Sequence, residues 1–137
     1  MDINILINLE KIYHYLIYFF SSIFLFAIFF KSYITFTPYN EIGLISKGNT
    51  AASWLLGGTL LGFAINLGFA MFYSYNIFQF IFYGFISGII QLISYSALRI
   101  IFKNLHIEIR ENNNIAIGML FGAIAICIGI LNGASAY

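Results

Sequence analysis

The sequence predicts an all-α integral membrane protein that crosses the bilayer four times. Hydrophobic residues make up 61% of its 137 residues and charged residues only 8%, whereas soluble domains carry about 25% charged residues. Several charge-free runs are long enough to cross a bilayer, and they lack the alternation of polar and apolar residues that is typical of strands. Only helices or closed barrels satisfy every backbone group in lipid, so the lipid bilayer is the expected partner. A net charge of +1 offers no basic surface for a nucleic acid.

The first span is predicted from Tyr13 to Ile34. The 19 residues between Lys11 and Lys31 carry no charge, and a helix needs about 20 apolar residues to cross the hydrocarbon core. A cleaved signal peptide is the alternative, but its apolar core would be about 7–15 residues long and end at a small-residue cleavage site. This run ends in bulky phenylalanines, which favours a membrane span.

The next charge-free run holds 51 residues between Lys47 and Arg99. As a single helix it would be about 77 Å long, more than twice the bilayer core, so it must fold back. Its most polar cluster, residues 73–76, predicts the turn. The second span then runs from Thr50 to Phe72 and the third from Ile77 to Phe102.

The last charge-free run covers residues 112–137 and predicts a fourth span from Ile115 to Ala136. Together the four spans predict a single membrane domain over residues 1–137, because a chain of this length is typical of one domain.

Basic residues predict the topology. The loops 35–49 and 103–114 fall on one side of the membrane. Five basic residues belong to that side: Lys31, Lys47, Arg99, Lys103 and Arg110. The other side holds only Lys11, so the positive-inside rule makes both loops cytoplasmic and both termini periplasmic or extracellular. Aromatic residues are expected at both interfaces: Tyr13, Tyr15, Tyr73, Tyr75 and Tyr137 at the outer one, and Tyr33, Tyr39, Trp54 and Tyr95 at or near the inner one.

A shift of 65 residues places residues 47–70 over residues 112–135 and indicates an internal repeat. The six identical positions are Asn49/Asn114, Ala51/Ala116, Leu55/Leu120, Gly57/Gly122, Ile65/Ile130 and Gly68/Gly133. The chain is therefore interpreted as two tandem helical hairpins, residues 12–72 and residues 77–136. A pseudo-twofold axis along the membrane normal would relate them.

The motif Tyr39-Asn40-Glu41, followed by Lys47-Gly48-Asn49-Thr50-Ala51-Ala52 and Gly57-Gly58, resembles the YjfL-like family of small bacterial inner-membrane proteins, catalogued as domain-of-unknown-function family 350. The second copy, from Glu111 to Ile117, has Asn112-Asn113-Asn114 where Gly-Asn is usual. The resemblance implies a four-helix protein of the bacterial inner membrane built from two repeats. It implies no reaction and no substrate.

Two asparagines, Asn49 and Asn114, stand where the second and fourth spans begin. Their expected role is to cap the helix N-terminus, which is worth about 1 kcal/mol. In the functional alternative, the two positive helix ends hold an anionic group such as a lipid headgroup.

Three glutamates lie in the loops that are predicted to be cytoplasmic: Glu41, Glu108 and Glu111. The plain interpretation is a set of solvated loop charges paired with Lys47, Lys103 or Arg110. The functional alternative is a pair of carboxylates that frames a small cation or a polyamine at the mouth of the bundle, with Glu41 facing the symmetry axis.

The third span carries a stripe of polar residues at helical spacing. Its members are Gln79, Tyr83, Ser87, Gln91 and Ser94, and Asn66 in the second span is a possible partner. A glutamine in hydrocarbon needs a partner, so this face is expected to point inward. It either bonds the helices together or lines a path for a solute or protons.

Small residues repeat at every fourth position in three of the four spans. The motifs begin at Gly58, Gly84, Gly118 and Ala125, and such motifs let helices approach closely. Three seams exceed what one four-helix bundle obviously needs, so a homo-oligomer is a possible assembly. The first span has no glycine and is expected to be the most lipid-exposed.

The chain has no motif for a cofactor, a metal or catalysis. His14 and His106 are expected on opposite sides of the membrane, and Cys127 lies within the fourth span. We therefore expect no enzyme. The first functional hypothesis is a small transport or permeation module with a site at the repeat junction. The alternative is a non-catalytic membrane scaffold or envelope-stress component. These two hypotheses are distinguished by the direction in which Asn66, Gln79 and Gln91 point. An enzyme would be favoured by a cluster of Glu41, His106 and Glu108. The sequence names no protein partner.

Overall fold

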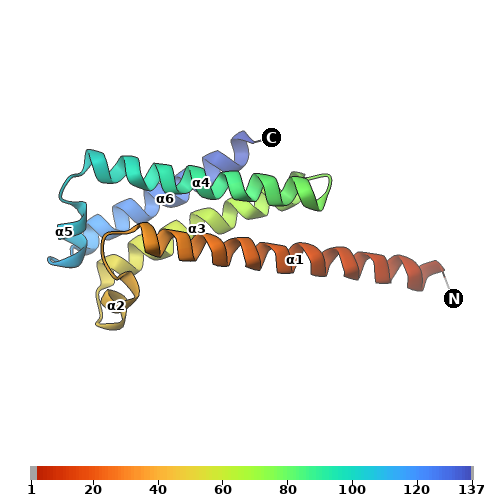
Figure 1. Cartoon of the computed structure of the whole chain (residues 1–137), viewed down its shortest axis with the longest axis horizontal. Helices are drawn as coiled ribbons and strands as arrows, with labels where there is room; N and C mark the ends of the chain where they lie inside the picture. Colours follow the sequence, from red (N-terminus) through yellow and green to blue (C-terminus); the bar gives the residue numbers. More distant parts are fainter. Residues whose placement is uncertain (1–2, 137) are drawn as a thin grey trace.

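The fold is entirely helical over the part of the chain that the computed structural model describes, which is the backbone of residues 3–136 and the side chains of residues 5–136. The described residues form four long helices and two short ones, whose arrangement Figure 1 shows. The long helices are α1 (Ile3–Phe36), α3 (Thr50–Tyr73), α4 (Ile77–Ile101) and α6 (Ile115–Ser135); the short ones are α2 (Glu41–Ser46) and α5 (Leu105–Arg110). All four long helices are long and apolar enough to cross a membrane. The predicted all-α class and four spans are confirmed.

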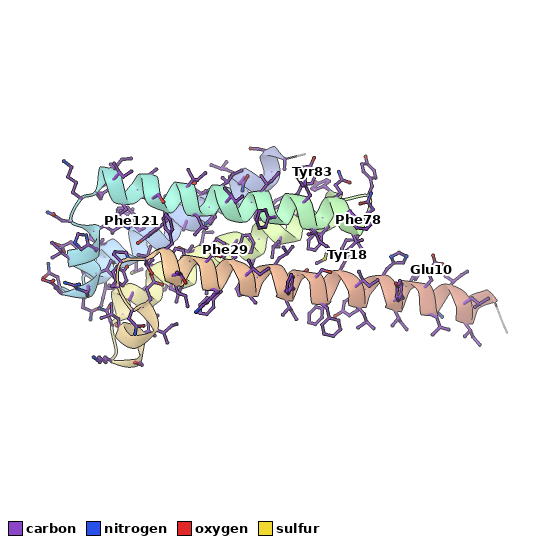
Figure 2. The ribbon with its side chains drawn as sticks, viewed as in Figure 1. Glu10, Tyr18, Phe29, Phe78, Tyr83 and Phe121 are labelled. Carbon is purple, nitrogen blue, oxygen red and sulfur yellow. The ribbon has the colours of Figure 1, made fainter. Side chains whose placement is uncertain are left out.

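The first helix is longer than predicted. The α1 helix begins at Ile3, ten residues before the predicted start of the first span. The charges of Glu10 and Lys11 limit the apolar stretch but do not end the helix, and Glu10 lies one turn before His14, with 3.9 Å between the carboxylate and the ring nitrogen. At 34 residues α1 is about 51 Å long, against about 30 Å for the hydrocarbon core. Its N-terminal part, including Glu10, extends beyond the other helices (Figure 2).

The other three spans match their predicted bounds to within one residue. The turn between α3 and α4 falls at residues 74–76, inside the predicted polar cluster. Asn76 caps α4 by accepting a hydrogen bond from the amide of Gln79, and Ser74 ends α3 by bonding back to the carbonyl of Ala70. A polar cluster interrupts a long apolar run here because its side chains satisfy the free helix ends.

The closest packing in the molecule joins α3 to α6, which run in the same direction. A Cβ atom at Gly58 would lie 2.6 Å from the carbonyl carbon of Gly122, and one at Gly129 would meet the backbone of Gly62. One at Gly118 would meet the backbone of Ala51. Glycine is therefore required at these positions, because only a residue without a side chain lets the two backbones touch.

The glycines of α4 pack against side chains rather than backbone. Gly84 faces Leu25 of α1 and Leu67 of α3, and Gly88 faces Phe29 and Phe63. Stacking of the Phe29 and Phe63 rings, with centroids 4.1 Å apart, joins α1 to α3.

All of the predicted small-residue seams are therefore used between helices of one chain. The excess of seams that suggested a homo-oligomer does not exist, because the motifs of α3 and α6 form one shared contact and that of α4 serves α1 and α3. The expectation that the first span is the most exposed helix agrees with the structure: 11% of the residues in its most apolar window are buried, against 50%, 28% and 28% in α3, α4 and α6.

The two short helices lie at the same end of the bundle, as Figure 1 shows for α2 and α5. The predicted loops 35–49 and 103–114 thus share one side of the molecule, but each contains a helix of six residues. Three of the aromatic residues expected at the inner interface are instead buried: Tyr33, Tyr39 and Tyr95 are 0%, 8% and 5% exposed. Trp54 is half exposed. Tyr137 lies outside the described residues.

Candidate functional site

The asparagines at the starts of α3 and α6 are helix caps, as predicted. The side-chain oxygen of Asn49 accepts a hydrogen bond from the amide of Ala52 at 2.8 Å, and that of Asn114 accepts one from the amide of Ile117 at 3.2 Å. Both residues have the extended backbone that is typical of an N-cap. The backbone amides of Ala52 and Ile117 are therefore not free to bind an anion. That the two helix ends hold a lipid headgroup stays a prediction for the other amides at the starts of α3 and α6.

The residue before each cap has a left-handed backbone. Gly48 has φ of 87° and Asn113 has φ of 45°, and the 65-residue shift aligns these two positions. Glycine adopts this conformation at no cost, and asparagine tolerates it better than other residues do. The replacement of the usual glycine by Asn113 therefore keeps the turn that leads into the helix.

The asparagine side chains also join the two junctions to each other. The amide nitrogen of the Asn49 side chain donates to the carbonyl of Ile109 in α5 at 2.8 Å. In return, the side-chain oxygen of Asn113 accepts a hydrogen bond from the amide of Ala51 in α3 at 3.0 Å. Hydrogen bonds thus fix the starts of α3 and α6 beside each other.

Two of the three predicted loop glutamates, Glu108 and Glu111, lie in or next to α5. The Glu108 carboxylate accepts hydrogen bonds from the side chains of Asn112 at 3.0 Å and Asn114 at 2.9 Å. Glu111 forms an ion pair of 2.6 Å with Arg110, and both of these side chains are about half exposed. The predicted pairing with a basic residue is confirmed for Glu111, whereas Glu108 is held by asparagines.

The third glutamate, Glu41, is not a solvated loop charge. It is the first residue of α2 and only 1% of its surface is exposed. Within the described residues, neither of its carboxylate oxygens has a hydrogen-bond partner, and no basic side chain pairs with it. The plain interpretation of Glu41 is therefore wrong. The sequence pattern could not reveal this burial, because it depends on where the α1–α2 connection folds.

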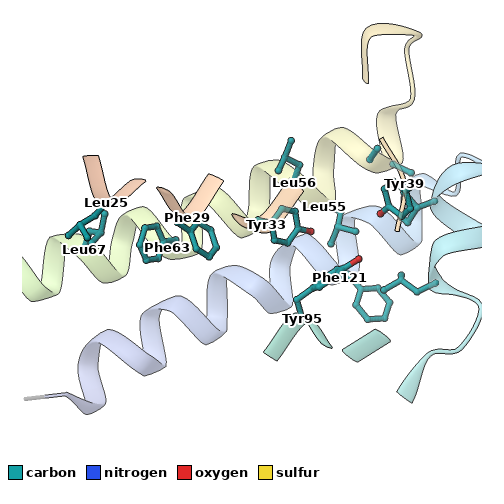
Figure 3. Packing of buried hydrophobic residues seen from close by; sticks show 14 of the residues in the cluster. Leu25, Phe29, Tyr33, Tyr39, Leu55, Leu56, Phe63, Leu67, Tyr95 and Phe121 are labelled. Carbon is teal, nitrogen blue, oxygen red and sulfur yellow. The ribbon is translucent and has the colours of Figure 1, made fainter. Parts of the chain in front are cut away.

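Three tyrosines surround this carboxyl group: Tyr33 of α1, Tyr39 of the connection and Tyr95 of α4. The Tyr33 hydroxyl interacts with the Glu41 carboxyl group, and Tyr39 lies two residues before Glu41 in the chain. The rings of Tyr33 and Tyr95 pack edge to face with centroids 5.1 Å apart, and Figure 3 shows the three labelled hydroxyl groups directed toward a common region. The hydroxyl oxygens of Tyr33 and Tyr39 are buried without a hydrogen-bond partner among the described residues.

Burial raises the pKa of Glu41 from 4.5 to about 8, and an interaction with the Tyr33 hydroxyl lowers it by a smaller amount. The position of Glu41 in the first turn of α2 favours its ionised form by about 0.3–1 kcal/mol. An unpaired buried charge costs several kcal/mol, so the effect of burial on the pKa of Glu41 exceeds that of the helix N-terminus. Burial also raises the pKa of Tyr39, with Tyr95 and Glu41 acting in the same direction.

The polar stripe of α4 divides into two parts. Ser87 and Gln91 are buried: the Ser87 hydroxyl donates to the side-chain oxygen of Asn66 at 2.9 Å, and the Gln91 side chain donates to the carbonyl of Ala125 at 3.0 Å. Asn66 is thus a partner of the stripe, as predicted.

Of the other members of the stripe, Tyr83 is half-buried and packs against the core, whereas Gln79 and Ser94 bond locally. The Gln79 side chain accepts a hydrogen bond from the amide of Tyr75 at the start of α4, and Ser94 bonds to the carbonyl of Ile90 one turn earlier. The cavity beside Gln91 and Ser94 has a volume of about 10 Å³. A single water needs about that much or more, so this space forms no path.

Two members of the group that would favour an enzyme, Glu41 and Glu108, have different surroundings. Glu41 is buried among tyrosines, and Glu108 is bonded to asparagines of its own loop. Over the described residues, no group of three or more histidine, cysteine or acidic side chains is placed to hold a metal ion.

These features define a small polytopic membrane protein. They are four apolar helices, two helix N-caps that hydrogen bonds join at one end, and a buried acidic site. The sequence profile of the family described as Domain of Unknown Function (DUF350) matches residues 6–136. The chain belongs to this family. It is 36% identical over 126 residues to the UPF0719 inner membrane protein YjfL of Escherichia coli strain K12 and to that of Escherichia coli O157:H7, and each match covers 92% of this chain and 95% of the relative. No solved structure matches the chain.

Proposed function

We propose that the chain is a non-catalytic structural component of the bacterial inner membrane, whose four spans form a closed bundle. The observation that carries this proposal is the state of the polar stripe: Ser87 and Gln91 bond to neighbouring helices within tight packing. A solute path would require these side chains to line a continuous space. The inner-membrane assignment is supported by the names of the two bacterial relatives.

The proposed topology places the α2 and α5 end of the bundle in the cytoplasm and both termini outside. Support comes from the positive-inside rule, because the two loops that carry three of the six basic residues lie together at this end. We also propose that the chain is a tandem repeat of two hairpins, residues 12–72 and 77–136. The paired caps at Asn49 and Asn114, and the left-handed residues before them, support the repeat.

Transport is the second candidate, and one specific observation favours it. The side-chain nitrogen of Asn66 and the side-chain oxygen of Gln91 are buried without a hydrogen-bond partner among the described residues. Unpaired polar atoms within a span are costly, and a solute that passes through the bundle could bond to them.

Flux into liposomes tests the proposal. The purified protein is reconstituted, and the uptake of protons, Na⁺, K⁺ and spermidine is compared with that of protein-free liposomes. The structural role predicts equal uptake, and it predicts that Gln91→Leu still folds into a monodisperse protein. Ser94→Ala is the matched control, because Ser94 lies on the same helix but bonds only within it. Uptake by the wild type that Gln91→Leu abolishes and Ser94→Ala retains would establish transport instead.

A further inference from the structure

No hydrogen bond among the described residues compensates the burial of the Glu41 carboxyl group. An acidic side chain at the start of a short surface helix normally points into water, whereas this one is 1% exposed. Asn40 already caps α2, through a hydrogen bond from the amide of Gly43, so the carboxyl group is not needed as a cap. Its two oxygens face the interior and accept no hydrogen bond there.

The groups around Glu41 can be assigned element by element. The α1 helix contributes Tyr33, the α1–α2 connection contributes Tyr39, and α4 contributes Tyr95. The guanidinium group of Arg99 on α4 lowers the pKa of Tyr39 but, among the described residues, forms no ion pair with Glu41. The α3 helix contributes Thr59 beside Tyr33, and its hydroxyl donates to the carbonyl of Leu55. One acidic group therefore stands without a compensating positive charge.

A single positive charge without a hydration shell would balance this site. The oxygens of Glu41 make no contact with solvent, so a hydrated ion does not fit beside them. A proton needs no space, and it turns the carboxyl group into a donor as well as an acceptor. Tyrosine hydroxyls can donate and accept too, so the buried and unpartnered hydroxyls of Tyr33 and Tyr39 suit a neutral carboxylic acid.

We propose that Glu41 and the hydroxyl groups of Tyr33, Tyr39 and Tyr95 form a site that binds one proton, and that this proton holds α2 against the bundle. Loss of the proton leaves a carboxylate that reaches water only if α2 moves outward. The α2 helix is short, and the connection at residues 47–49 ends it with a glycine in the left-handed conformation. The site thus links the position of α2 to pH on the side of the bundle where α2 lies.

Hydrogen exchange of the full-length protein in detergent, measured by mass spectrometry, tests this proposal. Exchange at residues 41–47 is compared between about pH 6 and about pH 9.5, after correction for the intrinsic effect of pH. With a pKa of about 8 in the docked state and 4.5 in the released state, the wild type should lose up to about 100-fold in protection. The tyrosines should not contribute, because the pKa of Tyr39 is raised. The α5 helix, at the same end of the molecule, is the internal reference and should not change.

Two variants make the result specific. Glu41→Gln has nearly the same shape but does not titrate, so its α2 should stay protected at both pH values. Tyr33→Phe removes the hydroxyl that lowers the pKa of Glu41, so its loss of protection should continue to a higher pH than in the wild type before it levels off. A purely structural role of Tyr33 would change the degree of protection without moving the pH at which the loss levels off.

Salt distinguishes a proton from a metal ion. The measurement at about pH 9.5 is repeated with NaCl, KCl or choline chloride at about 100 mM, where screening is equal for the three. The proton site predicts the same exchange in all three salts. Protection that Na⁺ or K⁺ restores and choline does not would replace the proposal with an alkali-metal site. Equal protection of α2 in the wild type at both pH values would also overturn it.

Discussion

Substitution of Gly58 by alanine should separate α3 from α6. The added Cβ atom would lie 2.6 Å from the carbonyl carbon of Gly122 and closer still to its Cα and oxygen atoms. Because these are backbone atoms, no side-chain rotation relieves the contact, and the helices must part by about 1 Å. A gap of 0.5–1 Å forfeits about a quarter to a half of the dispersion energy along the seam. Overpacking of this kind costs about 1–3 kcal/mol.

The matched control is Gly57→Ala. Gly57 is the preceding residue on the same helix, but a Cβ atom there has nothing within 4 Å. Alanine is the better helix former, so this variant should be as stable as the wild type or slightly more stable. Any general effect of adding a methyl group to α3 is therefore measured separately from the contact with α6.

Reversible unfolding in mixed micelles, with sodium dodecyl sulfate as the denaturant, gives the free energy difference. A loss of about 2–3 kcal/mol for Gly58→Ala corresponds to about a 30- to 140-fold change in the unfolding constant. Equal stability of the two variants would refute the close contact of α3 with α6, and with it the packing on which the closed bundle depends.

Three further outcomes follow from the same structure. Gly84→Ala should cost less than the seam variant, about 1 kcal/mol, because its Cβ atom would meet the flexible end of Leu25 rather than backbone; a larger loss in the same unfolding assay would contradict this. Asn49→Ala should cost more than the ~1 kcal/mol of a cap alone, since it also removes the bond to Ile109, and Asn49→Ser should recover part of the loss. The pKa of Glu41 is raised in the folded state to about 8, so the folded protein binds the proton more tightly than the unfolded chain does. The free energy of unfolding should therefore fall by a few kcal/mol as pH rises from 4.5 to 8. A fall of the same size in Glu41→Gln would assign the pH dependence to other groups.

The sequence predicts the spans well because charge is so expensive in lipid. Three of the four spans match to within one residue, and the cap residues at both junctions are those expected. The exception is α1, whose start was placed at the edge of the apolar run. Charged residues predict where a span leaves the hydrocarbon core, but they do not end the helix. The α1 helix continues through Glu10, whose carboxylate lies 3.9 Å from the ring nitrogen of His14 one turn later.

The site was harder to predict, because its environment depends on side-chain contacts between distant segments. The 65-residue shift aligns Gly57 with Gly122, yet Gly122 packs against Gly58 and Gly57 lies on an open face. A repeat alignment identifies equivalent positions along the chain, whereas packing depends on the rotation of each helix. In the same way, helical spacing predicts that Gln79 and Gln91 share one face of α4. In the structure, Gln79 bonds at the start of its own helix, whereas Gln91 bonds to α6.

Glu41 shows why composition alone gave the wrong environment. A glutamate that follows an asparagine at the start of a short helix is the usual pattern of an exposed helix N-terminus, and nothing local distinguishes it. Its burial arises because α1 ends at Phe36 and the chain turns back through Tyr39, which brings the start of α2 under the bundle. Sequence did contain one indirect signal. The positions of Tyr33 and Tyr95 in their spans predict that both lie at the inner interface, at the end of the bundle where α2 lies. A tyrosine at an interface needs a polar partner for its hydroxyl. Two such tyrosines on neighbouring helices, with a glutamate in the adjacent loop, form a pattern that can be sought in other four-span proteins.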